Sequence, residues 1–447
     1  MDLRTFLDAA RAQGWLATVD RPVDPNLELA AVAYALDGRP VLFENVIGHP
    51  GWRVVSGVAA ARKHFALALG VEPGDILFRL AEAMARPQSP PVIEDAPCQE
   101  VIHRPGDLHD LPILKHLPDD AGPYVTAGVA IVRDPDTGLN ASYHRLQRLD
   151  GRHFAARLVE NRGTYTAWRK TAGDLPIAIA IGLPLHALLA ASMSPPAGVF
   201  EMAIAQALAP TPLTRCLTSD LLVPAQAEVV LEGRITHRLT AEGPFIDLTE
   251  TSDIVRQQPV IEIDAITHRH NPIYHALLPG QLEHKLLMGM PKEPGIFAAV
   301  REVADVRNVH ITPGGASWLH AVVQIAKHHP DDGRRAIEAA YRGHGSLKHV
   351  VVVDEDIDIF DPNDVEWAIA TRVQAGRDVF IFRDQPSSSL DPSARHIPGQ
   401  KSRSDKAGVD ATIPWDTPTG PTHPEHFHRI PFPRLDVEAY LRERNDR

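Results

Sequence analysis

The sequence predicts a multidomain protein of combined α/β and β class, with an α/β region first, a β-rich region next and a second α/β region last. A chain of 447 residues is too long for one ordinary hydrophobic core. Segments that alternate in polarity or are rich in β-branched residues concentrate in the middle of the chain. A proline-rich stretch at 85–97, ARPQSPPVIEDAP, separates that part from the first region. We therefore expect domains at residues 1–99, 100–284 and 285–447.

The first region alternates helices with short strands. Leu3, Phe6, Leu7 and Ala10 have the spacing of an amphipathic helix. The run at 24–26, Asp-Pro-Asn, supplies a polar cap for a second helix. The expected strands lie at 16–19 and 40–43, and the expected helices lie at the N-terminus and at 27–36, 59–69 and 74–85.

The central region has the pattern of many short strands. Asp-Gly and Asp-Pro-Asp-Thr-Gly sequences provide tight turns, and short strands joined in this way favour a barrel or a sandwich. Two helices are expected among the strands, at 185–191 and 199–208. The expected strands span 128–133, 141–149, 154–158, 177–182, 227–233 and 260–266.

The last region returns to an α/β pattern. Residues 350–353, four consecutive valines, predict a strand buried on both faces of a sheet. From residue 387 the chain is rich in Pro, Ser and His and is expected to be irregular until a short helix at 435–444. The other expected elements are strands at 306–311 and 349–353 and helices at 317–328, 334–343 and 365–375.

Composition excludes several classes of function. A formal charge of -12 opposes general nucleic-acid binding, because an acidic surface repels phosphate backbones. Two cysteines, Cys98 and Cys216, cannot build a disulfide framework or a thiolate metal cluster. No stretch reaches the roughly 18 apolar residues of a membrane span, and the acidic N-terminus does not match a signal peptide. We expect a cytoplasmic globular protein without a nucleic-acid partner.

The segment at 140–163 is the first candidate site. It gathers an amide, a phenol, an imidazole and several guanidiniums within one hairpin-sized unit. Because Arg matches phosphate with a rigid fork of donors, this set suits a planar, phosphorylated cofactor. The side chains concerned are those of Asn140, Tyr143, His144, Arg145, Arg157 and Arg162.

Three carboxylates are further candidates. Glu242 and Asp247 flank a Gly-Pro turn, an arrangement that suits proton transfer when an Arg lies nearby, although such carboxylates are more often simply solvated. Glu201 follows a Pro-Pro-Ala-Gly bend among apolar residues; it either pairs with a cation or complements a helix N-terminus. The 23 histidines include no HExxH pattern, and Rossmann, P-loop and GxSxG motifs are absent from the sequence.

Several motifs together resemble the UbiD family of decarboxylases, which use prenylated FMN. The segment NASYHR at 140–145 is similar to one family motif, and the run RLVENRG at 157–163 is similar to its cofactor-contacting run. Further similar segments occur in order along nearly the whole chain. They begin at Asp107, Ser192, Leu222, Glu242, Asp354 and Lys406.

The resemblance implies an architecture and a set of site residues. It implies an N-terminal α/β region, a split β-barrel that binds flavin as in flavin reductases, a linking helix and a C-terminal α/β domain for oligomerisation. Arg145 would bind the substrate carboxylate, Glu242 would support that Arg, and Asp247 would donate the proton. The metal ligands implied are Asn140, Glu201 and Asn161. The cofactor contacts implied are Thr126, Ser142, Tyr143, His144, Arg145, Arg157, Leu158, Val159, Arg162, Gly163, Ser192, Met193 and Lys406.

Two residues depart from the family pattern. Asn161 stands where relatives often have His as a metal ligand, which puts the coordination number in question. Ile246 stands where Gly is frequent between Phe245 and Asp247, and we expect its bulk either to narrow the substrate pocket or to shift the acid.

The predicted function is a reversible, non-oxidative prenylated-FMN-dependent decarboxylase of a small aromatic, heteroaromatic or α,β-unsaturated acid. The implied ions are Mn²⁺ and K⁺. The implied partners are a flavin prenyltransferase as cofactor supplier and further copies of the chain in a homodimer or homohexamer. The alternatives are a flavin reductase that uses FMN, and a non-catalytic assembly subunit. The sequence leaves open the substrate, the direction of flux and the roles of the histidines at 268–284 and 423–428.

Overall fold

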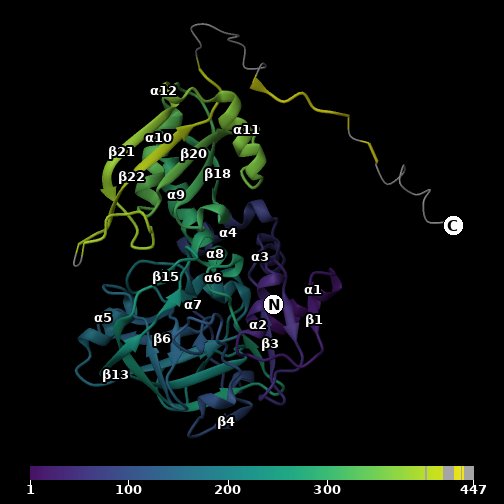
Figure 1. Ribbon diagram of the computed structural model, residues 1–447, viewed down its shortest axis with the longest axis vertical. Helices are drawn as coiled ribbons and strands as arrows, with labels where there is room; N and C mark the ends of the chain where they lie inside the picture. Colours follow the sequence, from purple (N-terminus) through teal and green to yellow (C-terminus); the bar gives the residue numbers. More distant parts are fainter. Residues whose placement is uncertain (398–399, 416–426, 434, 437–447) are drawn as a thin grey trace, which may run out of the picture.

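The protein contains three main sheets, joined by helices into one elongated molecule (Figure 1). The computed structural model describes residues 1–397, 400–415, 427–433 and 435–436. The helix expected at 435–444 therefore lies almost entirely outside the described residues. Within the described part of the chain, no helix has the length and apolar character needed to cross a membrane.

The first sheet has the order β1-β2-β3-β17. Its helices bury apolar faces against it as the sequence predicts; α1 begins after Asp2, which accepts a hydrogen bond from the Thr5 N–H and caps the helix. The fourth strand, β17, comes from after the central region and pairs in parallel with β3. The elements are α1 (Leu3–Ala12), β1 (Ala17–Val19), α2 (Glu28–Ala35), β2 (Val41–Phe43), β3 (Arg53–Ser56), α3 (Arg62–Leu69), α4 (Ile76–Ala85) and β17 (Ile273–His275).

The second sheet is antiparallel and has nine strands, in the order β5-β8-β9-β16-β13-β10-β6-β7 with β4 paired to β16. Two long strands, β13 and β16, form its centre. Within the described residues the end strands β5 and β7 do not pair, so no closed barrel forms. The strands are β4 (Val101–His103), β5 (Tyr124–Val125), β6 (Val129–Asp134), β7 (Gly138–Tyr143), β8 (Leu146–Arg148), β9 (His153–Ala156), β10 (Leu175–Ile181), β13 (Val229–Glu242) and β16 (Arg256–His268).

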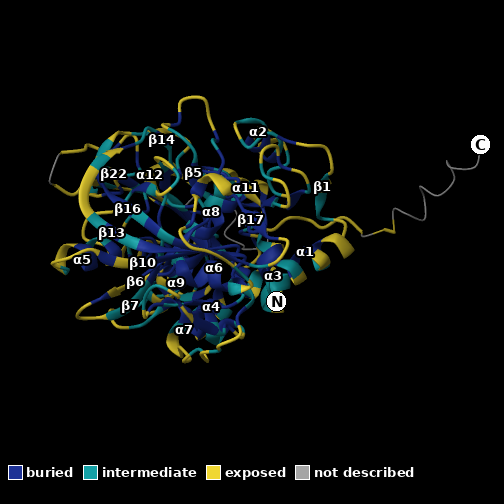
Figure 2. Ribbon diagram, turned by 90° about the horizontal axis from the view of Figure 1, so that it is seen from below, coloured by how far each residue is buried: buried dark blue, intermediate teal, exposed yellow. Residues whose placement is uncertain are grey.

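Helices and two small hairpins complete the central region. Buried residues concentrate around β10 and α6 (Figure 2), where the helices close the apolar face of the sheet. The expected single strand at 141–149 is broken at His144 and Arg145, because β7 pairs with β6 whereas β8 pairs with β5 and β9. The elements are α5 (Gly163–Lys170), α6 (Leu185–Ala191), α7 (Glu201–Leu208), β11 (Leu213–Arg215), β12 (Leu222–Pro224), β14 (Phe245–Ile246) and β15 (Ser252–Asp253).

The third sheet has the order β18-β19-β20-β22-β21. The helix expected at 317–328 is wrong: residues 320–326 form β19, because the short apolar run pairs with strands on both sides and is buried between them. The valines of β20 are buried on both faces, as predicted. The elements are β18 (Asp305–Ile311), β19 (His320–Ala326), α10 (Asp332–Gly343), β20 (His349–Asp354), α11 (Pro362–Arg372), α12 (Ala375–Asp378), β21 (Val379–Pro386) and β22 (Arg403–Asp410).

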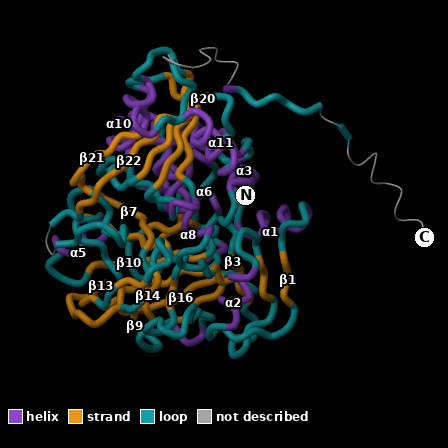
Figure 3. Tube along the Cα trace, turned by 45° about the horizontal axis from the view of Figure 1, so that its top comes forward, coloured by secondary structure: helices purple, strands orange, loops and turns teal. Residues whose placement is uncertain are grey.

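A nearly continuous helical run links the second and third sheets. It consists of α8 (Leu282–Gly289), the 3-10 turn η4 (Met290–Lys292) and α9 (Glu293–Arg301). Figure 3 shows α6 and α8 between the two larger sheets. Two buried carboxylates fasten the run to the first region: Glu283 accepts the Gly57 and Ala59 N–H groups, and Glu293 accepts two bonds from Arg62. The linking run is therefore held by the N-terminal region.

Candidate active site

Arg145 gathers three carboxylates around its guanidinium. Its Nε and Nη2 donate to the two carboxylate oxygens of Glu242 at 2.9 and 3.0 Å. Nη2 also donates to Asp253 Oδ2 at 2.9 Å, and Nη1 lies 3.6 Å from Asp247 Oδ2. The structure thus brings together the three predicted catalytic residues. It adds Asp253, which the sequence analysis did not identify.

Local structure explains how these side chains meet. Arg145 occupies the break between β7 and β8, and Glu242 is the last residue of the long strand β13. The chain then turns at Gly243, whose φ of 95° suits glycine and whose N–H donates to Gln147 Oε1. The hairpin of β14 and β15 returns Asp247 and Asp253 toward Arg145. Asp253 lies six residues after Asp247, in the strand that pairs with β14. A hairpin predicted at this position would have indicated that Asp253 lies close to Asp247.

Burial makes the pair of Arg145 and Glu242 rigid and strong. Glu242 has no exposed surface, and the Arg145 guanidinium lies 5.3 Å from the centre of the Phe245 ring. Burial by itself would lower the pKa of Arg145, but the bond to Glu242 and the charges of Asp253 and Asp247 outweigh it and raise that pKa. Arg145 is therefore a permanent cation in a fixed plane.

Asp253 links Arg145 to a second guanidinium. It accepts a hydrogen bond from Arg256 Nη1 at 2.6 Å. Burial would raise the pKa of Asp253, but the Arg256 bond and the charges of Arg145 and Arg256 lower it below its ordinary value. The cluster therefore holds three carboxyl groups, those of Glu242, Asp247 and Asp253, and two guanidiniums.

His284 lies beside this cluster, on α8. Its Nδ1 accepts the Gly280 N–H at 3.0 Å, which leaves Nε2 to carry the ring proton. Burial lowers the pKa of His284; the charge of Asp247 opposes that effect, and those of Lys285 and Arg145 add to it. A neutral imidazole therefore stands near Asp247, and its Nε2 makes no hydrogen bond to the described residues; the sequence did not reveal this position.

A second group of predicted residues meets at Glu201, at the start of α7. Asn140 Nδ2 donates to Glu201 Oε1 at 2.9 Å, and the Ala141 N–H donates to Oε2 at 2.7 Å. Glu201 is only 4% exposed. Burial raises its pKa to about 7, although the bonds from Ala141 and Asn140 act in the opposite direction.

The donors around Glu201 fit a hard divalent cation. The carboxylate meets only neutral donors among the described residues, and the amide of Asn140 adds an oxygen that such ions accept. A Cβ on Gly163 would lie 2.6 Å from Asn140 Oδ1, so glycine keeps that oxygen accessible. No group of three carboxylate, imidazole or thiolate side chains with metal-binding geometry occurs in the described part of the chain. Any ion held here would take its remaining ligands from elsewhere, such as a phosphate.

Hydrogen bonds place other predicted cofactor contacts next to Asn140. Ser142 Oγ lies 3.1 Å from Thr164 Oγ1, and His144 Nε2 lies 2.9 Å from the same hydroxyl. His144 Nδ1 contacts the Arg157 carbonyl at 3.0 Å, and burial lowers the pKa of His144 to about 4. His144 is therefore a neutral, positioned donor at ordinary pH.

The remaining predicted residues are more widely distributed. Asn161 is exposed, has a left-handed φ of 62°, and has no hydrogen bond to Asn140 or Glu201 among the described residues. Lys406 lies on β22 of the third sheet and donates to the Gly345 carbonyl. The others lie in the segment from the end of β5 to the two residues after α6: Thr126, Tyr143, Leu158, Val159, Arg162, Ser192 and Met193.

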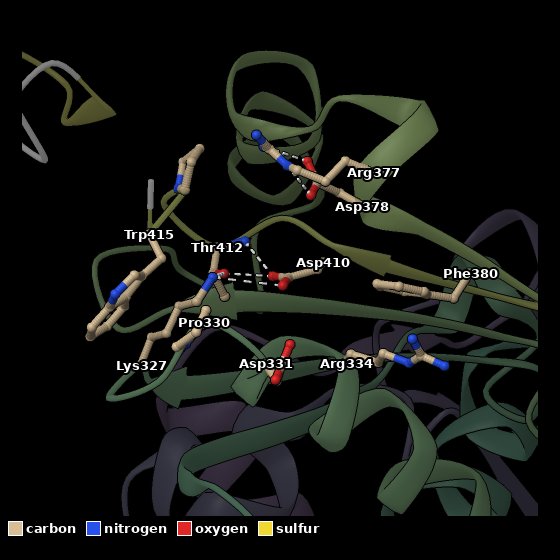
Figure 4. A pocket seen from close by; sticks show the side chains of 11 residues that line it. Lys327, Pro330, Asp331, Arg334, Arg377, Asp378, Phe380, Asp410, Thr412 and Trp415 are labelled. Carbon is tan, nitrogen blue, oxygen red and sulfur yellow. Dashed lines mark hydrogen bonds and ion pairs between the residues drawn. The ribbon is translucent and has the colours of Figure 1, made fainter. Parts of the chain in front are cut away.

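A pocket of about 310 Å³ lies in the third region, away from these residues (Figure 4). Four of its charged side chains form two pairs: Lys327, which donates to Thr412, lies 3.7 Å from Asp410, and Arg377 pairs with Asp378. None of the predicted site residues lines it. The pocket is therefore separate from the candidate active site.

Comparison with known families covers almost the whole chain. Models of the N-terminal, Rift-related and C-terminal domains of 3-octaprenyl-4-hydroxybenzoate carboxy-lyase, the UbiD family, match residues 7–84, 91–282 and 285–411. The anhydromevalonate phosphate decarboxylase of Methanosarcina mazei is 43% identical over 417 residues, 92% of this chain and 96% of that protein. That of Methanothermobacter thermautotrophicus is 42% identical over 420 residues, 92% of this chain and 97% of that one.

Solved structures agree with these relatives. The UbiD-class enzyme HmfF from Pelotomaculum thermopropionicum, in complex with FMN, has a TM-score of 0.92 and 42% identity, with 98% of this chain and all of that chain covered. An evolved dimeric form of HmfF was solved with prFMN. The 3,4-dihydroxybenzoic acid decarboxylase AroY from Klebsiella pneumoniae has a TM-score of 0.90 and 28% identity, with both chains fully covered. This chain therefore belongs to the UbiD family of carboxy-lyases and is a decarboxylase.

Proposed function

We propose that the protein is a prenylated-FMN-dependent, reversible, non-oxidative decarboxylase of a small aromatic, heteroaromatic or α,β-unsaturated acid. The observation that carries this proposal is the guanidinium of Arg145, locked by the buried Glu242 and flanked by the more exposed Asp247. A fixed cation beside an acid is what binding a carboxylate and protonating the carbon left behind require.

The cofactor, when bound, supplies the electron sink that cleavage next to an sp² carbon requires and that no side chain offers. Arg145 holds the substrate carboxylate, and Glu242 keeps the guanidinium in its plane. The bond between the carboxylate carbon and the substrate breaks, CO₂ leaves, and Asp247 gives its proton to the substrate carbon. Asp247 then regains a proton from water, and carboxylation is the same sequence in reverse.

The residues around Glu201 and Asn140 fit the phosphate end of this cofactor. A buried carboxylate next to a phosphate dianion would be repelled without a cation, so a Mn²⁺ ion held by Glu201 and Asn140 balances the charge. His144, Arg157 and the loop that ends at Gly163 stand beside that position. We keep Asn161 as a candidate third ligand and K⁺ as a candidate second ion.

The wider proposal has several further parts. The nine-stranded sheet corresponds to the flavin-binding split barrel, and the domains are residues 1–99, 100–284 and 285–447. A flavin prenyltransferase supplies the cofactor. The protein is cytoplasmic and forms homodimers or homohexamers.

Reconstitution with prenylated FMN tests the reaction directly. We expect solvent deuterium exchange and CO₂ release with at least one acid of a panel of unsaturated and aromatic acids. Oxidation of NAD(P)H by the FMN-loaded protein without such exchange would support a flavin reductase instead. Oligomers that bind neither flavin and turn over no acid would support the non-catalytic assembly subunit.

Glu201→Gln will abolish tight Mn²⁺ binding, because it replaces the carboxylate with a neutral side chain of the same shape. In the wild type, Mn²⁺ competes with the proton on Glu201, so its affinity will fall about tenfold per pH unit below pH 7 and level off above it. Calorimetric titration of Mn²⁺ on both sides of pH 7 measures both effects. A wild-type affinity that does not change with pH would contradict the assignment.

In the metal-free protein, the carboxyl group of Glu201 makes the free energy of unfolding depend on pH. Its pKa is about 7 when folded and 4.5 ordinarily, so the folded protein holds a proton that the unfolded chain releases between these values. The free energy of unfolding of the metal-free wild type will therefore fall as the pH rises from about 4.5 to 7. Glu201→Gln will lack this part of the pH dependence in denaturant titrations.

A further inference from the structure

Lys292 is a cation that the proposed chemistry has not used. It is partly buried in η4, at the junction of α8 and α9, and its Nζ donates to Ser194 Oγ at 2.9 Å. No ion pair among the described residues includes it. Burial lowers its pKa to about 8, and the positive charge of Arg162 adds to that effect. A partly buried cation that lies near a second cation and has no carboxylate partner is unfavourable by itself, and a bound anion would stabilise it.

The surroundings of Lys292 extend this positive region into the third sheet. Lys292 Nζ lies 5.9 Å from the Trp318 ring centre, and the same ring contacts His344 edge to face at 4.5 Å. His344 is 8% exposed, and its Nε2 has no hydrogen-bond partner in the described part of the chain. Its neighbour Gly345 accepts a hydrogen bond from Lys406, which also lacks a carboxylate partner among the described residues. The charges of Lys292 and Lys406 both act on His344, whose Nε2 has no partner among the described residues.

We propose that Lys292, supported by Ser194 and His344, binds a second anionic group of the substrate, a carboxylate or a phosphate, in addition to the carboxylate that is cleaved. This inference rests on the proposed decarboxylation and narrows its substrates to dianionic or more highly charged unsaturated acids. The two ammonium protons that Lys292 does not donate to Ser194, the Ser194 hydroxyl and an imidazole N–H match the several acceptor oxygens of such a group.

The position of Lys292 favours the substrate over the phosphate of the cofactor. The helical run that carries Lys292 also carries His284, which stands beside Asp247 and Arg145. Eight residues along a helix span about 12 Å, so one rigid element extends from the decarboxylation centre to Lys292. The residues that fit the metal and cofactor phosphate come from other elements, Asn140 from β7 and Glu201 from α7. We therefore infer that the linking run lies along the substrate, with His284 near the carboxylate that is cleaved and Lys292 near the second anionic group.

The test compares acids that differ by one anionic group. Crotonate carries one carboxylate, glutaconate carries a second carboxylate, and 4-phosphooxybut-2-enoate carries a phosphate in addition to its carboxylate. Butyrate and glutarate are saturated analogues that cannot react, so their binding can be measured by calorimetry. With wild-type holoenzyme, we expect glutarate to bind at least tenfold more tightly than butyrate, and KM to be lowest for one of the two dianionic acids. Lys292→Met will raise KM for that acid about 10- to 100-fold and leave kinetics with crotonate unchanged. Lys292→Arg will keep the preference for the dianion.

Two controls separate this inference from its alternatives. Lys170→Met removes a lysine of α5 that pairs with Asp134 and Asp136, and it will leave every value unchanged. If purified Lys292→Met carries less flavin by absorbance, or loses activity equally with crotonate and glutaconate, the anion belongs to the cofactor and the inference is wrong. Equal wild-type binding of butyrate and glutarate would also overturn it. Failure of all acids to exchange would refute the proposed decarboxylation, whereas the calorimetry would still report on Lys292.

Discussion

Arg145→Lys will lower kcat/KM by about 1,000-fold or more, although the positive charge is kept. A lysine cannot hold both oxygens of Glu242 and a substrate carboxylate in one plane, as the guanidinium fork does. Several charge-assisted hydrogen bonds are lost together, each worth roughly 1.5 to 3 kcal/mol. Steady-state decarboxylation by prenylated-FMN-loaded protein measures the loss, and flavin absorbance shows that the cofactor remains bound.

The variant Arg145→Met, compared with a double variant, distinguishes the contribution of Arg145 to catalysis from its contribution to stability. It leaves Glu242 buried and unpaired, and breaking a buried pair in this way costs about 3 to 5 kcal/mol of stability. The double variant Arg145→Met with Glu242→Gln removes both charges, so we expect it to recover much of the unfolding free energy but none of the activity. Recovery of activity in the double variant, or near-normal activity in Arg145→Lys, would show that Arg145 does not hold the substrate.

Asp247→Asn will abolish net decarboxylation while the breaking of the carbon–carbon bond continues. Asparagine keeps the size of the side chain but has no proton to deliver, and positioned acids contribute about 10²- to 10⁴-fold to rate. We expect product formation and incorporation of solvent deuterium to fall by at least about 100-fold. Exchange of ¹³C-bicarbonate into the substrate carboxylate will persist, because it requires loss and return of CO₂ but no proton at carbon.

Asp253→Asn is the matched control for Asp247→Asn. Asp253 contacts Arg145 and Arg256 in the same cluster, and its replacement changes the local charge by the same amount. We expect it to weaken substrate binding modestly and to leave the ratio of deuterium incorporation to ¹³C exchange unchanged. If Asp247→Asn and Asp253→Asn lower both exchange reactions alike, the acid is not Asp247 and the cluster acts only through its charge.

Local sequence predicted most of the elements and the identity of the family. The spacing of Leu3, Phe6 and Leu7 predicted α1, and the valines of β20 predicted a strand buried on both faces. The helix expected at 317–328 failed because the short apolar run HAVVQIA does not distinguish a strand from a helix until it pairs with β18 and β20. The barrel could not be decided from strand patterns, because closure depends on which edge strands pair.

The sequence by itself determined that Arg145, Glu242 and Asp247 were the residues to examine, because its motifs resemble those of the UbiD family, which implies these roles. Only the tertiary structure decided that Glu242 is fully buried against Arg145, that Asp253 joins them, and that His284 stands beside Asp247. It also placed Lys292 and His344, 52 positions apart in sequence, near the same Trp318 ring. The physical reason is that unpaired charge and burial are properties of neighbours in space, and neither can be read from one segment of the chain.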